Sequence, residues 1–501
     1  EYTGASAPDS NFSKKNLRGA KYEDYNFEGS NFDDCDLTGA VLLHCDLREC
    51  SFDNAIMTNI TLDNCYMSNS SLENAKLNGA RIRNVTLVES DLSFAIFDGA
   101  DLSRSVFNYC VVNETSFKGA IMRSTQLLAI NSPHNYTGEA IVTFERADLT
   151  AAKLKFSRTE SKIKIKDAIL IGSYLEQASI TGEELKDMDF SSSTLKNVGL
   201  YEVNISNSNF NSCHIDGLYF RGSTIKKVYF NNSEIRAIFF VQSRMEECSF
   251  DYVSENVNEG YITIEESTAV KCSYLQSGNV TVNLSLEDSK LVNCKFGNSD
   301  LTIQKSGLSS TFDGSSFICS NISQRSPDEP GGAIFQECIF RDSKFSSFRM
   351  ENMVMTRCEF TKISFENIIA VDCELSNNKF QEFVMDSLEV HSMKIVSNDF
   401  NDAKFTKTHF RDCDSFKQNN FTDTTFKDVS MDECEMVGNT FHEKISFDVC
   451  KIDNSRLNNK YLSVPPTERV TLNLSNIGRE DSKVFAYFLQ RSRKPNLIGR
   501  S

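Results

Sequence analysis

The chain has few of the residues that build loops and irregular folds. Among 501 residues there are 7 Pro, 23 Gly and no Trp. Loop-rich domains and disordered chains contain more of these breakers or long polar stretches of low complexity. No apolar run approaches the length of a membrane-spanning helix. We therefore expect a regular, ordered chain without a membrane span.

The motifs of common catalytic and cofactor sites are also missing. Only 6 His occur, and none has a partner at the spacing of a helical metal site such as HExxH. GxxxxGK[ST], GxGxxG, GxSxG and CxxC patterns are all absent from the sequence. We expect no catalytic residues, no cofactor and no bound metal, and thus no enzyme.

The formal charge is −16 at pH 7, without a long acidic run. The first explanation of this negative charge is that it keeps a long surface solvated. The alternative is an acidic field that suits a basic partner or imitates DNA. An excess of carboxylates opposes direct binding to nucleic acid.

A five-residue repeat dominates residues 10–127. Every fifth residue is large and apolar, and the residue two places before it is usually small. Since a period of five fits neither a helix nor a simple strand, it indicates stacked repeats. Alternate residues of an extended segment share a face, so the small and the large residue both point inward. Asn, Asp and Gly after the large residue predict a turn. The large positions begin Phe12, Leu17, Tyr22, Phe27, Phe32 and continue to Leu127.

Segments such as SNFDDCDLTGA (30–40), SLENAKLNGA (71–80) and AIFDGADLSRS (95–105) carry an A-(D/N)-L-x-x pattern. In these segments the chain resembles the pentapeptide-repeat family. The resemblance implies an all-β fold, a right-handed four-sided β-helix in which four repeats make one coil. It also implies a protein that binds partners rather than one that catalyses a reaction.

Breaks in the repeat predict six segments of one continuous solenoid. Regular β-helix blocks are expected at 1–127, 170–250 and 335–460. Repeats interrupted by a loop at 128–146 and an irregular stretch at 155–167 are expected within 128–169. Degraded repeats with loops are expected at 251–334, where YITIEES and NVTVNLSLE alternate like longer strands. A cap that contains a helix is expected at 461–501.

Most of the 16 Cys occupy the small position of a repeat, where they alternate with Ala, Ser and Thr. This pattern indicates small core residues in a reducing compartment rather than a disulfide framework. Cys45 and Cys65 are one coil apart, as are Cys338 and Cys358. Both a disulfide and a ladder of free thiols are compatible with that spacing. Parallel side chains in a reducing cell favour the thiols.

Aromatic residues replace polar ones at several outward positions of the second block. Tyr219 and Phe239 are one coil apart and should stack, whereas Tyr229 lies half a coil away. Aromatic groups at a surface are typical of partner sites. Cover by an adjoining loop (128–167 or 251–285) is the equally weighted alternative. Ile334 and Val354 form a weaker pair of the same kind.

Residues 479–493 are expected to form a helix. Its apolar side carries Val484, Phe485, Tyr487, Phe488 and Leu489. An open solenoid end needs a cap, and we expect this helix to supply it. A homodimer contact through the same residues is the alternative that the resemblance implies.

The sequence favours a non-enzymatic protein-binding scaffold. Its length and its Phe- and Cys-rich repeats resemble bacterial secreted effectors of the pentapeptide-repeat class, which dock host proteins along a rod surface. The expected location is the bacterial cytoplasm, or the host cytoplasm after secretion. The alternative is a DNA mimic that binds a type II topoisomerase such as gyrase and modulates or protects it.

Overall fold

The computed structural model folds into two compact units, Glu1–Asn258 and Glu259–Ser501. Every regular element among the described residues is a β-strand or an isolated β-bridge, without any helix. The described residues are 2–130, 141–157, 161–251, 261–275, 283–287, 289–297, 300–303, 310–313, 315–318, 321–323, 333–346, 349–413, 415–442, 446–448, 450–453, 456–460 and 470–473.

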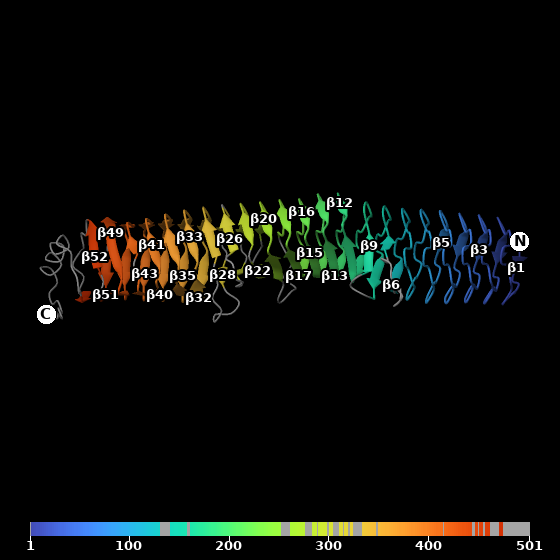
Figure 1. Cartoon of the computed structure of the whole chain (residues 1–501), viewed down its shortest axis with the longest axis horizontal. Helices are drawn as coiled ribbons and strands as arrows, with labels where there is room; N and C mark the ends of the chain where they lie inside the picture. Colours follow the sequence, from blue (N-terminus) through green and yellow to red (C-terminus); the bar gives the residue numbers. More distant parts are fainter. Residues whose placement is uncertain are drawn as a thin grey trace. The chain divides into compact units, whose positions relative to one another are not determined.

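The first unit is a stack of coils whose equivalent residues lie side by side in parallel. Asn31 bridges to Ser51, its equivalent four repeats later, and Ser51 bridges in turn to Ser71. The Asn31 N–H donates to Ser10 O at 2.9 Å, and the Phe32 N–H donates to Ser51 O at 2.7 Å. Figure 1 shows these coils as a row of turns coloured blue to cyan. Four five-residue repeats therefore make one coil, as predicted.

Both inward positions of the repeat are buried, which confirms the sequence-based prediction. Phe32 is 2% exposed, and the small residues Cys35 and Ala40 are 0% exposed. Rings stack along the inside from coil to coil. Phe32 and Phe52 lie 4.9 Å apart between ring centroids, with an interplanar angle of 5°. Each buried large side chain contributes roughly 1.5–3 kcal/mol, so the interior stabilises every coil.

Polar residues at the small inward position bond to the coil before them. The Ser105 Oγ–H donates to Ile82 O at 3.0 Å. The Cys110 thiol does the same to Leu87 O at 3.2 Å. Buried polar groups are therefore satisfied by the ladder itself, which explains why Ser and Cys alternate with Ala at this position.

Each repeat ends at a corner where one residue has a left-handed backbone. Gly39 (φ 67°) and Asp34 (φ 58°) occupy two such corners. Gly adopts this conformation without strain, and Asp and Asn tolerate it better than most side chains. The left-handed backbone at each corner therefore explains why Gly, Asp and Asn follow the large residue in the sequence.

Extended stretches of the first block are short, and many are single bridges. One side carries five strands paired in parallel: β1 (Tyr2–Thr3), β2 (Lys21–Glu23), β3 (Val41–Leu43), β4 (Thr61–Asp63) and β5 (Arg81–Arg83).

The stretch expected to interrupt the repeats is more regular than predicted. It contains four strands: β6 (Gln126–Ile130), β7 (Ile141–Thr143), β8 (Lys153–Phe156) and β9 (Ser161–Lys164). β6 pairs with β8 and β7 with β9, although the coil between Gln126 and its partner Lys153 is longer than a regular one. The prediction of a loop and an irregular stretch is wrong for these residues. Phe156 and Ile163 are each 1% exposed, because the longer coil keeps its inward apolar positions.

Strands lengthen in the second block. Three of them, β13, β15 and β17, have eight residues each and pair in parallel. The strands here are β10 (Tyr174–Glu176), β11 (Ala178–Thr181), β12 (Glu184–Lys186), β13 (Thr194–Tyr201), β14 (Asn204–Ser206), β15 (His214–Arg221), β16 (Thr224–Lys226), β17 (Glu234–Val241) and β18 (Arg244–Glu246).

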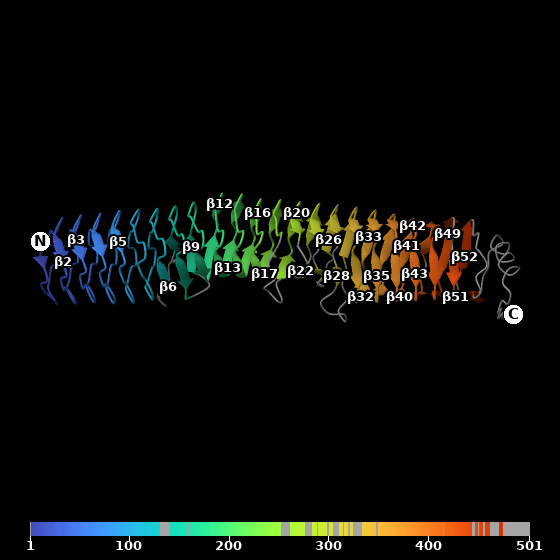
Figure 2. The ribbon, with the colours of Figure 1, turned by 180° about the vertical axis from the view of Figure 1, so that it is seen from behind.

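The second unit is also built from parallel ladders. β19 (Tyr261–Glu265) and β22 (Asn283–Glu287) pair along their whole length, which confirms the longer strands predicted for the degraded repeats. Figure 2 shows the later coils in yellow to red. Two of its ladders contain β29 (Ala333–Gln336), β33 (Val354–Thr356), β37 (Glu374–Ser376), β41 (Lys394–Val396), β45 (Ser415–Lys417), β30 (Ile339–Arg341), β34 (Glu359–Thr361), β38 (Lys379–Gln381), β42 (Asp399–Asn401), β46 (Asn420–Thr422) and β49 (Glu435–His442).

The C-terminal prediction falls outside the described residues. This applies to the helix at 479–493 and its apolar residues, so the cap or dimer contact stays a prediction. Most of the Pro/Gly-rich stretch 323–332 also falls outside them.

Candidate functional site

An outward aromatic pair stands on the second block. Tyr219 on β15 and Phe239 on β17 are partners in the parallel ladder. Their rings stack with centroids 4.6 Å apart and an interplanar angle of 3°. Tyr219 is 36% exposed, and Phe239 is half-buried. This geometry confirms the predicted stacking, while a role in binding stays a prediction.

Two glycines lie beside the rings of this surface, and one of them makes room for a ring. Gly199 is the ladder partner of Tyr219 in the coil before. A Cβ on Gly199 would lie 2.3 Å from the ring of Tyr201, so that ring covers the Gly199 backbone. Gly217 has φ 89°, and a Cβ there would lie 2.8 Å from Asn197 Oδ1, so this glycine makes room for the Asn197 side chain. Tyr201, Tyr219 and Phe239 together form what we call the aromatic surface. Sequence reasoning missed Tyr201, although the glycine two places before it was a readable signal.

A paired carboxylate lies on the adjoining side of the same coils. The side chain of Glu176 on β10 is 8% exposed and forms ion pairs with Lys155 at 3.3 Å and Lys196 at 3.5 Å. The Tyr174 hydroxyl donates to it at 2.5 Å. Burial raises the pKa of Glu176, but the Tyr174 hydrogen bond and the two Lys lower that pKa further, below its ordinary value. Lys155 and Lys196 thus compensate the buried carboxylate and join three successive coils.

The other predicted contact residues lie on different ladders. Tyr229 is 39% exposed and bridges to Asn209 and Ser249, half a coil from Tyr219. Ile334 on β29 pairs with Val354 on β33 in the second unit, and both are half-buried. Their pairing was predicted correctly.

The described cysteines are internal thiols. Fourteen of them are free and buried. Burial raises the pKa of Cys50, Cys110 and Cys213 to about 12 in each case. A thiol is nucleophilic only as the thiolate, so these side chains are unreactive core residues.

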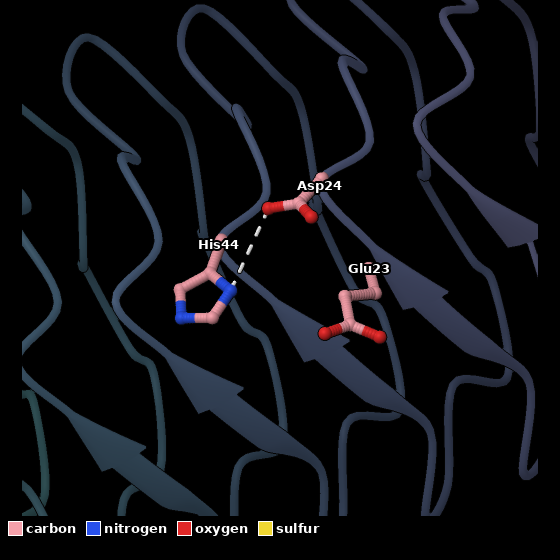
Figure 3. Close-up of side chains that lie close together, drawn as sticks. All are labelled: Glu23, Asp24 and His44. Atoms are coloured by element: carbon pink, nitrogen blue, oxygen red, sulfur yellow. Dashed lines mark ion pairs between the residues drawn. The ribbon is translucent and has the colours of Figure 1, made fainter.

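Three side chains from neighbouring coils gather near the N-terminal end of the first unit (Figure 3). His44 Nδ1 lies 3.6 Å from Asp24 Oδ1, and Glu23 lies beside them, with ligand atoms of all three within 4.8 Å of one another. All three residues are exposed. Sequence spacing did not reveal the group, because His44 is one coil from Asp24. Exposed ion pairs of this kind contribute about 0–1 kcal/mol, and nothing else at the site points to a metal.

One side of the first block carries only acidic charge over four coils. Its repeats at 30–34, 50–54, 70–74 and 90–94 contain no Lys or Arg, but five carboxylates: Asp33, Asp34, Asp53, Glu73 and Asp91. Half a coil further on, on the opposite side, stand Arg81, Arg83 and Arg104. Asp63 and Asp101 stand on that opposite side as well, and Arg83 forms an ion pair with Asp101, so only the first side is purely acidic.

A shallow groove lies at a corner of the second unit. Its volume is about 310 Å³, and charged, polar and apolar side chains line it, without His or Cys: Lys362, Ile363, Ser364, Glu382, Val384, Asp402 and Lys404.

These coils, with buried small and large positions and left-handed corners, define a parallel β-solenoid made of five-residue repeats. Residues 10–42, 26–59, 45–84 and 86–123 match the family model described as pentapeptide repeats, in 8 copies. Residues 10–123 therefore carry the repeats of that family.

Solved structures with detectable likeness include two pentapeptide-repeat proteins and a resistance protein. Rfr23 from the cyanobacterium Cyanothece 51142 is 23% identical over 20% of this chain and 80% of its own, with a TM-score of 0.19. HetL from the cyanobacterium Nostoc sp. strain PCC 7120 is 17% identical over 48% and 90%, with a TM-score of 0.19. QnrB1, a plasmid-mediated fluoroquinolone resistance protein, is 16% identical over 44% and 91%, with a TM-score of 0.21. No curated protein matches the chain in sequence.

The stacked coils and the repeats at 10–123 define a repeat scaffold. Among the described residues, no helix is long and apolar enough to cross a membrane.

Proposed function

We propose that the chain binds a protein partner through the aromatic surface. The stacked rings of Tyr219 and Phe239 support this, because they occupy outward positions that are polar in regular repeats. Aromatic residues dominate the energetics of many interfaces. Paired ladder strands hold the rings in place, so binding loses little conformational entropy.

The finer proposal is a bacterial secreted effector that docks a host protein. It acts in a reducing compartment, either the bacterial cytoplasm or the host cytoplasm. The absence of disulfides among the fourteen described cysteines supports such a compartment. A homodimer through residues 484–489 is a separate proposal, which sedimentation of the full chain tests.

The test of the aromatic surface is a pull-down from host-cell lysate with the full chain as bait. The variant combines Tyr219→Asn with Phe239→Asn. Asn is a residue that regular repeats carry at this outward position. The matched control is Tyr66→Asn with Tyr109→Asn, which removes rings that are 60% and 56% exposed on the first block. We expect the first variant to lose its partner at least tenfold and the control to retain it. Retention by the first variant at an unchanged melting temperature contradicts the proposal.

The second candidate is a DNA mimic that binds a type II topoisomerase. The acidic side of the first block favours it, since a stripe of carboxylates imitates a phosphate backbone. The opposite side is mixed, because Arg81, Arg83 and Arg104 stand there with Asp63 and Asp101, so the purely acidic stripe is limited to one side. A gyrase supercoiling assay tests this function, with Asp53→Asn and Glu73→Gln as the neutralised variant. No effect of the parent chain on supercoiling rejects this candidate without affecting the first.

A further inference from the structure

Cations of the same sheet adjoin the aromatic surface. Arg221 lies two places after Tyr219 on β15, so both side chains leave the sheet on the same side. Its ladder partners are Tyr201 in the coil before and Val241 in the coil after. Arg221 is exposed, and it forms no ion pair with the residues that the structure describes.

The row of the stacked rings leads to two further cations on β9. Gly199, the ladder partner of Tyr219, pairs with Ser179 on β11. Ser179 in turn pairs with Lys162, and the exposed Lys164 lies two places further along β9. No Asp or Glu occurs in β9, in β11 or in the last three residues of β13, β15 and β17. This side of the coils is therefore basic, on a chain with a formal charge of −16.

The first halves of the same strands are arranged differently, because cations there have a carboxylate beside them. Lys196 on β13 lies 3.5 Å from Glu176 of the coil before. Arg236 on β17 lies 3.4 Å from Asp216 of the coil before. These coils can thus hold a carboxylate next to a cation, and the lack of one beside Arg221 leaves positive charge for a partner to compensate.

The carboxylates nearest to the aromatic surface along the chain, Glu183 and Glu202, stand at corners. Glu183 Oε2 accepts a backbone N–H of the coil before at 3.1 Å, and its charge interacts with that of Lys164. A Cβ on Gly222 would lie 3.5 Å from Cγ of Glu202, so the Glu202 side chain lies over the next corner. Lys164 is therefore partly compensated, which makes Arg221 the main cation of this surface.

We propose that the aromatic surface binds an acidic segment of a protein. Its carboxylates contact Arg221 and Lys164, and an apolar side chain packs against the edges of the stacked rings. This inference rests on the proposed function and adds the chemistry of the partner. A guanidinium holds a carboxylate with two parallel hydrogen bonds, and Arg and Tyr are enriched at interface hot spots. Complementary charge also fixes the register in which two surfaces meet.

A nucleic-acid strand fits this surface less well. Binding of single strands uses ring faces on which bases stack. The faces of Tyr219 and Phe239 that point toward each other are occupied, because the two rings lie parallel with centroids 4.6 Å apart. The net negative charge of the chain also opposes phosphates.

The experiment selects random dodecapeptides displayed on phage against the full chain. Peptides that bind the parent but not the variant with Tyr219→Asn and Phe239→Asn are sequenced. We expect them to be enriched at least about threefold in Asp and Glu over the unselected library, and to contain an aromatic or aliphatic residue.

One selected peptide is then labelled and titrated with a neutralised variant, Arg221→Ser with Lys164→Ser. The matched control is Arg244→Ser with Lys186→Ser, which removes two exposed cations from β18 and β12 and changes the net charge equally. We expect the neutralised variant to bind at least about fivefold more weakly at low salt, with a smaller difference at high salt, and the control to match the parent. Circular dichroism shows which variants fold, and Arg221→Ser alone suffices.

Peptides that depend on the rings but lack the acidic enrichment overturn this inference and leave the proposed function standing. Equal weakening in the neutralised variant and the control does the same. If no peptide depends on the rings, the proposed function fails together with the inference. Binding of a labelled oligo-dT strand that is lost in the neutralised variant also overturns the inference, because the basic side would then serve a nucleic acid.

Discussion

The side chains of Asn398 and Asn419 lie in successive coils and are joined by a hydrogen bond of 3.0 Å from Asn398 Nδ2 to Asn419 Oδ1. The Asn398 N–H donates to the same oxygen at 2.9 Å, and Asn398 Nδ2 also donates to Leu375 O at 2.8 Å. Asn378 and Asn439 extend the row, and all four Asn are at most 1% exposed. A buried amide is costly unless its hydrogen bonds are made. In this row the amides of Asn378, Asn398 and Asn419 each bond to the coil before and the coil after.

Removing one amide from the row should destabilise the second unit. Asn398→Ala leaves Leu375 O and two N–H groups of Asn378 without their partners. Each buried unsatisfied group costs about 1–3 kcal/mol, so we expect the free energy of unfolding in urea to fall by about 3 kcal/mol or more. The control is Asn401→Ala, which truncates an exposed Asn on β42. Equal effects of the two substitutions would show that the row contributes nothing specific.

Extending the row by one amide should stabilise it. Asn378 Oδ1 accepts a hydrogen bond from the backbone N–H of Cys358 at 2.9 Å. With Cys358→Asn, a side-chain N–H could donate to the same oxygen. We expect Cys358→Asn to raise the free energy of unfolding by about 1 kcal/mol. Cys373→Asn is the matched control, since its slot neighbours in the ladder are Met353 and Met393. That variant should be less stable than the parent, and a gain there would contradict the explanation.

Internal thiols should resist alkylation while the chain is folded. Burial raises the pKa of Cys50 to about 12, and that of Cys110 to about 12, so almost no thiolate is present at pH 8. We expect iodoacetamide to label these residues only after unfolding in urea, as read by mass spectrometry of peptides. Labelling of native protein at the rate of a small free thiol would place these side chains at the surface. Cys50→Ser should cost less than about 1 kcal/mol, because Ser70 fills the same slot one coil later and its hydroxyl donates to Leu47 O at 2.9 Å.

Glu176 should make stability depend on pH in the acid range. Its pKa is lowered in the folded chain by the Tyr174 hydroxyl, Lys155 and Lys196, which outweigh the effect of burial. A lowered folded pKa means that the contribution is present above the unfolded pKa of about 4.3 and is lost as the pH falls through the folded value. We expect Glu176→Gln to cost about 1 kcal/mol at pH 7 and much less at pH 3.

The measurement for Glu176 is urea unfolding at a series of pH values. Glu184→Gln, an exposed Glu on β12, serves as the control and should follow the parent at every pH. A constant difference between Glu176→Gln and the parent from pH 7 to pH 3 would rule out the ion pairs as its cause.

The breaks in the five-residue repeat are where the sequence did not predict the structure correctly. The stretch after Leu127 loses the five-residue spacing, so the sequence predicts loop and irregular structure there. The described strands β6 to β9 nonetheless continue the ladder, because a coil can hold extra residues between paired positions, as between Gln126 and Lys153. The Asn row could have been found from its spacing of one coil and its place two positions before Phe, but each Asn alone resembles a surface residue.

By itself, the sequence determined which side chains line the inside of the regular coils, because inward and outward positions follow from local alternation and a constant spacing of five. Only the tertiary structure decided which residues meet across coils. His44 beside Asp24, Asn398 beside Asn419 and Tyr201 over Gly199 depend on how many residues each coil contains and on where each ring can lie. That information is set by pairing between distant segments, which no short stretch of the chain contains.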